Sequence, residues 1–340
     1  MNLEAASIKR ISVHFVGNKS EDEDLVLSKE TLALDGFTNE KLTEFFLNKF
    51  TKIQERYHFA HSSSLDYNEI YNYTKHIFYN KEDFHNVSLR VAQHLFECSE
   101  HPMVKAGEVY VCEFERIQIE GIFYRAVGIF KTENKYGFLE VGDFENNFDI
   151  EYKDGIDINK MDKACLILDT DEEIGFQVAI IDNLKSGSEA AQYWKDDFLG
   201  AVPTENEYYQ TKELLTITKE FIDKQLDEEF VVSNTDKIDL LNKSVNYFKA
   251  ADEFVLEEFN DAVLQNEEIQ KSFNDFSNNE FTESFAINEA AVKKNAKFFK
   301  SVIKLDKNFS LYVHGRKEMM EKGTDENGRR YYKLYYESEA

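Results

Sequence analysis

The chain has 340 residues, 42% of them hydrophobic and 14% aromatic, which is enough for two ordinary domains with packed cores and excludes a disordered chain. Its formal net charge of −25 at pH 7 excludes a uniformly basic surface, because a field of that sign repels nucleic-acid phosphate. No run of about 18 apolar residues is present, so a transmembrane helix is not expected.

Two further features bear on the location of the protein. The N-terminal sequence "MNLEAASIKRISVHFVG" lacks the apolar stretch and the cleavage site of a signal peptide. Cys98, Cys112 and Cys165 are far apart and odd in number, which favours free thiols in a reducing compartment. We therefore expect a cytoplasmic protein that does not associate with a membrane.

The N-terminal part combines helices with a series of strands. Short strands are expected at "ISVHFVG" and "DLVLS", and helices at 38–53, with Thr38 as N-cap, and at 85–98. From Gly107 the hydrophobic period changes to two, and strands are expected at 107–119, 122–132, 137–141, 164–169 and 175–182. Strands in such succession predict an antiparallel meander, so residues 1–185 are interpreted as an α+β domain with a mainly antiparallel sheet plus helices.

The stretch "DNLKSGSEAAQYWKDDFLGA" (182–201) contains the only tryptophan and leads from strands into helices. Ser186 and Glu189 have the spacing of a capping box, which predicts a helix that ends at Gly200. Trp194 is expected on the buried side of this helix, where it would anchor the sheet domain to the helical one.

Residues 186–340 are interpreted as a largely helical domain that ends in a β-hairpin. Helices are expected from Pro203 to about Phe230 and again over 237–276. After Lys300 the alternation of apolar and polar residues returns, and the runs 301–315 and 329–337 predict the two strands of a C-terminal hairpin.

Candidate catalytic and metal-binding residues are few. Asp196 and Asp197 are neighbours on the expected helix and point about 100° apart, so they are poorly placed to share a metal or a proton. Asp169, Asp171 and Asp182 follow two adjacent strands and could hold Mg²⁺, although a polar hairpin turn explains them better. Phosphate-binding glycine loops, dinucleotide fingerprints and nucleophile motifs are absent from the sequence. The sequence therefore predicts no catalytic residue, metal ligand or cofactor.

Charge is distributed unevenly along the chain. From Ala201 to Ala290 there are 7 Lys/Arg against 21 Asp/Glu, a net of −14, whereas residues 291–340 have 12 against 7, a net of +5. If this basic block begins as a helix, four of its lysines share one face at 4-3-4 spacing: Lys293, Lys297, Lys300 and Lys304. Such a face can contact several phosphates with little sequence choice, although an ordinary solvated lysine face is the alternative. The candidate nucleic-acid-binding residues are Lys185, Lys195, Lys293, Lys294, Lys297, Lys300, Lys304, Arg316, Lys317, Arg329 and Arg330.

Three segments carry a family resemblance. "YWKDDFLGA" (Tyr193–Ala201) is the most specific, "NFSLYVHG" (Asn308–Gly315) is similar to a late strand before a terminal hairpin, and "SIKRISVHFVG" is similar to a first strand. In this order they resemble the 37-kDa bacterial nucleoid-associated protein family, the NdpA-like proteins. The resemblance implies a cytoplasmic, nucleoid-located protein that associates with DNA, alongside DNA-processing enzymes, and it transfers no catalytic residue. In that family the turn before the aromatic helix is often rich in Lys and Arg, whereas here it keeps only Lys185, with Lys195 just beyond.

These observations leave three hypotheses. The first is a non-enzymatic nucleoid-associated protein that binds DNA, or alternatively RNA, through a local basic surface without strong sequence preference. The second is an acidic interaction protein whose helical region, 201–290, binds a basic or DNA-processing partner. The third and least favoured is a metal-dependent hydrolase built on Asp169, Asp171 and Asp182. The sequence leaves the oligomeric state open, a homodimer included.

Overall fold

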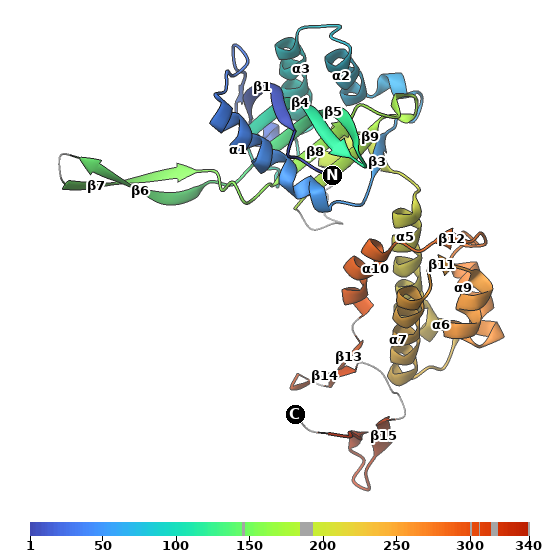
Figure 1. Ribbon diagram of the computed structural model, residues 1–340. Coiled ribbons are helices and arrows are strands. Elements are labelled where there is room, and N and C mark those ends of the chain that lie inside the picture. The colour runs from blue at the N-terminus through green and yellow to red at the C-terminus, as the bar shows by residue number, and fades with distance from the viewer. Residues whose placement is uncertain (145–146, 184–192, 300, 306, 314–318, 339–340) are drawn as a thin grey trace. The chain divides into compact units, whose positions relative to one another are not determined.

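A computed structural model describes residues 1–144, 147–183, 193–299, 301–305, 307–313 and 319–338 (Figure 1). The chain divides into two compact units, Met1–Thr204 and Glu205–Ala340. The sequence predicted a boundary after residue 185. The division follows Thr204 because the described residues from Tyr193 to Pro203 pack against the sheet of the first unit.

The first unit is built on an eight-stranded antiparallel sheet with the order β10-β3-β9-β8-β5-β4-β1-β2. Its strands are β1 (Ser7–Val16), β2 (Leu25–Val26), β3 (Tyr57–Phe59), β4 (Gly107–Ile119), β5 (Ile122–Thr132), β8 (Lys163–Leu168), β9 (Gln177–Asp182) and β10 (Ala201–Pro203). The predicted meander is confirmed, since β4, β5, β8 and β9 are neighbours in chain order. The expected strand 137–141 belongs to β6 (Tyr136–Phe144), which lies outside this sheet and pairs with β7 (Asn147–Gly155).

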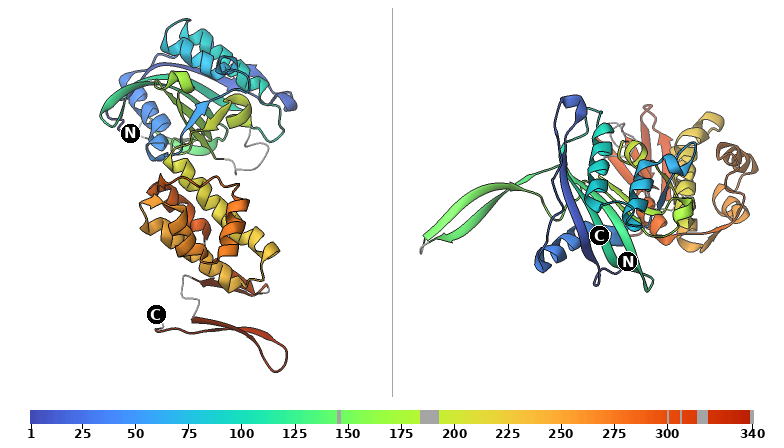
Figure 2. Two further views of the ribbon diagram at one scale, coloured as in Figure 1. Left: turned by 90° about the vertical axis from the view of Figure 1, so that its right-hand side faces the viewer. Right: turned by 90° about the horizontal axis from the view of Figure 1, so that it is seen from above.

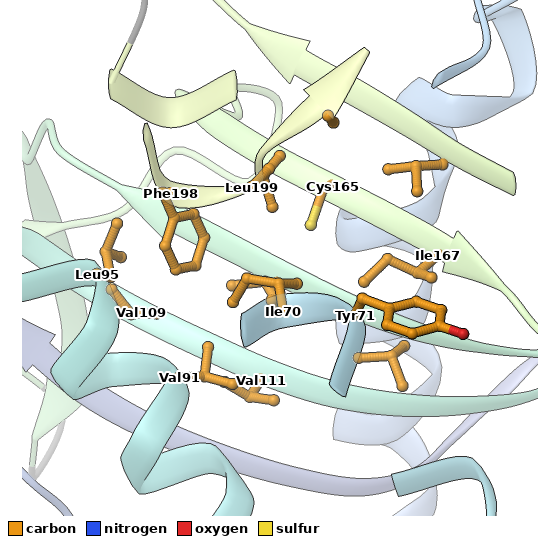
Figure 3. Close-up of a cluster of buried hydrophobic side chains, with 14 of the residues drawn as sticks. Ile70, Tyr71, Val91, Leu95, Val109, Val111, Cys165, Ile167, Phe198 and Leu199 are labelled. Atoms are coloured by element: carbon orange, nitrogen blue, oxygen red, sulfur yellow. The ribbon is translucent and has the colours of Figure 1, made fainter. Parts of the chain in front are cut away.

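Helices cover both faces of this sheet. On one face lie α2 (Glu69–Phe78), which the sequence did not predict, and α3 (Phe84–Glu97); on the other lies α1 (Gly36–Leu47) (Figures 1 and 2). Because successive side chains of a strand point to opposite faces, Val109 and Val111 meet α2 and α3, whereas Cys112 and Phe114 meet α1. Figure 3 shows the first of these clusters, where Val91 and Leu95 of α3 approach β4.

Polar side chains fix where the helices begin. Asp35 caps α1 by accepting a hydrogen bond from the backbone N–H of Thr38, so the prediction of Thr38 as the N-cap was wrong by three residues. Asp83 caps α3 in the same way. Asn68 caps α2 through the N–H of Tyr71.

The segment around the tryptophan leads into the edge strand of the sheet. Tyr193–Phe198 form a single π-helical turn, in which the N–H of Leu199 bonds to the carbonyl of Trp194 at 3.2 Å. Trp194 is fully buried in the first unit, with its ring centroid 4.9 Å from that of Phe198, so it does not have the predicted role of joining two domains. The predicted cap, Ser186 and Glu189, lies outside the described residues.

Leu199 and Gly200 connect the π-helical turn to the edge strand β10. Gly200 adopts a left-handed conformation, with φ +57°, and its carbonyl accepts the N–H of Ala60 at 2.9 Å. The Asn68 side-chain amide also bonds to the carbonyls of Leu199 and Gly200. The cap of α2 thus holds the end of the "DFLG" turn against β3.

The second unit is helical. Its helices are α5 (Glu207–Glu220), α6 (Leu226–Glu229), α7 (Asn234–Ala250), α8 (Leu256–Phe259), α9 (Glu267–Phe276) and α10 (Glu289–Asn295), with a short strand pair β11 (Glu253–Phe254) and β12 (Phe285–Ala286). Phenylalanine rings, among them Phe221, Phe259 and Phe273, fill its core. The helix that was expected to open at Pro203 begins after the cap Asn206, because Pro203 belongs to β10.

The C-terminal region is β-rich, as predicted, but contains two hairpins. β13 (Ser301–Leu305) pairs with β14 (Phe309–Val313), and β15 (Met320–Thr324) pairs with β16 (Arg330–Leu334). The expected pairing of 301–315 with 329–337 was wrong. Each strand pairs with its nearest neighbour in the chain, which closes a shorter loop and costs less entropy.

A buried histidine lies between β1 and α3. The Nδ1 atom of His14 accepts the N–H of Ser28 at 3.2 Å, and Nε2 lies 3.0 Å from the hydroxyl of Ser88. These contacts require the neutral ring, because a proton on Nδ1 would face another donor. Burial, and secondarily the proximity of His85, lowers the pKa of His14 to about 4.

We predict that Gly200→Ala destabilises the first unit by about 1–3 kcal/mol, because a non-glycine residue is strained in the left-handed region. The added Cβ would also lie 2.6 Å from the Asn68 amide nitrogen. Urea unfolding followed by the fluorescence of Trp194 measures the change. Gly142→Ala is the control, since a Cβ there meets no atom within 4 Å. Equal stability of the two variants would contradict the assigned role of Gly200.

We also predict that the first unit loses stability as the pH falls from about 6.5 to 4. The unfolded chain binds a proton at His14 near pH 6.5 and the folded chain near pH 4, so unfolding takes up a proton between these values. The loss is on the order of 3 kcal/mol. Urea unfolding at several pH values should show a shallower pH dependence for His14→Asn than for wild type. His61→Asn, at an exposed position, should keep the wild-type dependence.

Candidate nucleic-acid interface

The described candidate residues lie on several separate elements. Lys195 belongs to the π-helical turn of the first unit, and the others belong to the second unit. Lys185, Lys300, Arg316 and Lys317 lie outside the described residues.

The predicted single helical face of lysines was wrong. The helix α10 ends at Asn295, Lys297 follows in a 3₁₀ turn, and Lys304 belongs to strand β13. The run Ser-Val-Ile after residue 300 contains two β-branched residues, which favour a strand. Phe299 and Ile303 are buried, and this fixes the chain after α10 against the second unit.

The lysines of α10 and its following turn are exposed but not isolated. Lys293 forms an ion pair with Glu289 at 2.7 Å, and both side chains are largely exposed. The ammonium group of Lys294 lies 5.9 Å from the centre of the Tyr208 ring. An exposed ion pair of this kind contributes little stability, so Lys293 can leave the Glu289 carboxylate and bind another anion at little cost in free energy.

Lys195 lies in an acidic environment. Its ammonium group is 3.1 Å from Asp196, and Asp197 follows on the exposed side of the same turn. This turn therefore carries more negative than positive charge, which disfavours contact with phosphate.

Pairing in the β15–β16 hairpin separates its charges onto two faces. Directly opposite residues share a face, so Glu321 faces Lys333 on one side, and Lys322 faces Tyr332 on the other. On the first face Arg329 bonds to Asp325 at 3.0 Å and Lys333 lies 3.7 Å from Glu321, so the cations are matched by acids.

The second face is basic, and we call Lys322, Arg330 and Tyr332 the cationic face. The pair of Arg330 and Thr324 is the next one on the same face after the pair of Lys322 and Tyr332. Lys322 and Arg330 are both exposed. Neither Lys322 nor Arg330 has an acidic partner within the described part of the chain. The two cations can contact phosphates, and the tyrosine ring beside them can stack on a base.

Arg330 is among the nucleic-acid-binding residues predicted from the sequence, but Lys322 is not. That prediction also included Arg329, whose guanidinium is engaged by Asp325. The alternation of "MEKGT" could have indicated that Lys322 lies on the opposite face from Glu321. The pairing partner of this strand was needed to place Lys322 beside Tyr332.

The structure separates the aspartates of the hydrolase hypothesis. Leu168 pairs with Gln177, and Lys163 pairs with Asp182, so Asp169 and Asp182 lie at opposite ends of the antiparallel β8–β9 pair. Asp169 accepts a hydrogen bond from Arg125 at 2.9 Å, and Asp182 forms an ion pair with Lys163 at 2.7 Å. Among the described residues, no group of three or more His, Cys, Asp or Glu side chains is arranged to hold a metal ion.

Two buried lysines hold the start of the π-helical turn. Lys131 donates hydrogen bonds to the carbonyl of Lys105 at 2.6 Å and to the hydroxyl of Tyr193 at 3.3 Å. Lys163, opposite Lys131 in the sheet, lies 5.0 Å from the centre of the Tyr193 ring. Burial lowers the pKa of Lys131, and it raises the pKa of Tyr193. These groups bond to one another, which indicates that they anchor this turn.

Comparison with known proteins identifies the family. No curated protein matches the chain. No helix of the described residues is long and apolar enough to cross a membrane. A family model described as nucleoid-associated protein YejK matches residues 12–329, which cover most of both units and end directly before β16. The chain therefore belongs to this family of nucleoid-associated proteins.

Proposed function

We propose that the protein associates with DNA in the bacterial nucleoid as a non-enzymatic binding protein, without strong sequence preference. The cationic face of the β15–β16 hairpin makes the main contact, and the exposed lysines Lys293, Lys294 and Lys297 add to it. The observation that carries this proposal is the segregation of Lys322 and Arg330 from the acids of the same hairpin.

A local basic surface can act on a chain with a net charge of −25. At physiological salt, exposed charges are screened beyond about 8 Å, so a phosphate at the hairpin interacts mainly with nearby cations. The same screening makes the binding depend strongly on salt. Cations contact phosphates and a tyrosine ring stacks on any base, and neither contact distinguishes one sequence from another.

We predict that Lys322→Glu combined with Arg330→Glu lowers the affinity for duplex DNA at least tenfold at low salt. Each lost phosphate contact should also reduce the slope of log affinity against log salt by about 0.9. Salt-titrated fluorescence anisotropy with duplex DNA, single-stranded DNA and RNA measures both quantities and identifies the preferred nucleic acid.

The matched control is Arg329→Glu combined with Lys333→Glu. It changes the net charge equally but replaces cations that already face Asp325 and Glu321. We expect a much smaller effect on the salt slope. If both double variants bind equally weakly, net charge explains the binding and the cationic face does not.

The acidic helices favour a second candidate function, the binding of a basic protein partner. In residues 201–290 the few lysines are largely used within the unit: Lys219 pairs with Asp223, Lys224 with Glu220 and Lys243 with Asp239. Most of the 21 acidic residues of this region therefore keep their charge uncompensated.

For this function we predict that a basic partner stays bound to the tagged protein after nuclease treatment of a lysate and is released by salt. Mass spectrometry of the retained proteins, with and without nuclease, is the measurement. A partner that disappears with nuclease is bridged by nucleic acid, and that outcome supports the DNA-binding proposal alone.

A further inference from the structure

The hairpin formed by β6 and β7 is a separate ribbon of the first unit (Figure 1). The two strands pair along their full length, from Tyr136 opposite Gly155 to Phe144 opposite Asn147. Among the described strands, neither pairs with any other. A two-stranded ribbon alone is only marginally stable in water, so an additional packing partner would stabilise it.

The pairing of this ribbon places five large apolar side chains on one face, whereas Tyr136 and Phe138 lie on the other face. Leu139 is opposite Tyr152, Val141 is opposite Ile150, and Phe148 is opposite Asp143 at the next position of the same face. We call Leu139, Val141, Phe148, Ile150 and Tyr152 the apolar arm face. These side chains are 61–78% exposed.

The opposite face of the ribbon carries Tyr136 and Phe138 near the sheet and is acidic beyond them. Glu140 is opposite Glu151, and Gly142 is opposite Asp149. Lys153 contacts both glutamates of this face. Over residues 136–155 the sequence has six acidic residues and one lysine, but the pairs Leu139–Tyr152 and Val141–Ile150 at the centre of the apolar arm face contain none of them. The centre of the apolar arm face is therefore free of charge.

We propose that the apolar arm face packs against the same face of a second copy of this chain, about a two-fold axis. In this arrangement the two ribbons stack as a small sandwich about 10 Å thick, and both acidic faces point to solvent. Self-pairing of the uncharged centres brings no like charges together. A basic partner would instead be attracted to the acidic face, which leaves the apolar arm face uncovered.

The area available agrees with a dimer of moderate affinity. Five large side chains at this exposure offer roughly 500 Å² per copy, or about 1,000 Å² for the pair. This is close to the lower limit for a specific interface, so the dimer dissociates on dilution. Dimerisation would also place two cationic faces in one particle, and two linked sites bind DNA more tightly than one.

Sedimentation velocity over a range of protein concentrations tests the proposal. We expect a wild-type mass of two chains that falls to one chain on dilution. Val141→Glu places a charge in the dry centre of the interface, and this variant should sediment as a single chain at every concentration. Gly142→Glu is the matched control, because it adds the same charge at the next residue on the opposite face, where a Cβ meets no atom within 4 Å. It should remain a dimer.

Two further measurements separate a lost interface from a misfolded protein. The unfolding of the first unit, followed by Trp194 fluorescence, should be the same in Val141→Glu and wild type. A short thiol-reactive cross-linker should join two copies of Val141→Cys well above the background from Cys98, whereas Gly142→Cys should give background only. A wild-type protein of single-chain mass at all concentrations, a dimer that persists in Val141→Glu, or equal cross-linking of both cysteine variants would overturn the proposal.

Discussion

The burial of both faces of the antiparallel sheet is the constraint on which the first unit depends. An antiparallel sheet often leaves one face in water, but here all six residues of β8 are buried, because α1 covers one face and α2 and α3 cover the other. The edge of the sheet is completed by β10, which reaches β3 only through the buried Trp194 and the left-handed Gly200. The segment "YWKDDFLGA" is therefore structural: its aromatic side chains are buried in the first unit, and Asp196 and Asp197 are exposed.

The local charge of the surface depends on which charged side chains lie beside one another in each helix or hairpin. In the acidic helices of the second unit, lysines are neutralised by carboxylates one turn away. In the β15–β16 hairpin, cross-strand pairing matches some cations with acids and leaves others together on the opposite face. A protein with a strongly negative total charge can thus present a small positive surface, and the proposed DNA contact uses this surface alone. The apolar arm face arises from the same alternation, applied to hydrophobic residues.

Much of the fold could be predicted from the sequence. The bounds of β4 and β5 match the predicted runs 107–119 and 122–132, since alternation along a half-buried strand is a local signal and Gly121 marks the turn. The α+β class, the helical character of residues 207–276 and the β-rich C-terminus were also indicated by periodicity. Predictions of caps and of pairing partners were less accurate, as Thr38 and the C-terminal hairpin show, because several nearby residues or strands satisfy the same local pattern.

By itself the sequence determined the local periodicities, the uneven charge and the family to which the chain belongs. Only the tertiary structure decided that residues 137–141 leave the sheet and that Asp169 and Asp182 lie at opposite ends of a strand pair. It also decided that Arg329 pairs with Asp325 while Arg330 lies on the other face of the hairpin, beside Tyr332. The physical reason is the range of the interactions. Periodicity and charge can be read directly from residues that are close in the chain. The partner of a strand depends on contacts between distant segments, which the sequence pattern does not specify, and this pairing decides which side chains share a face.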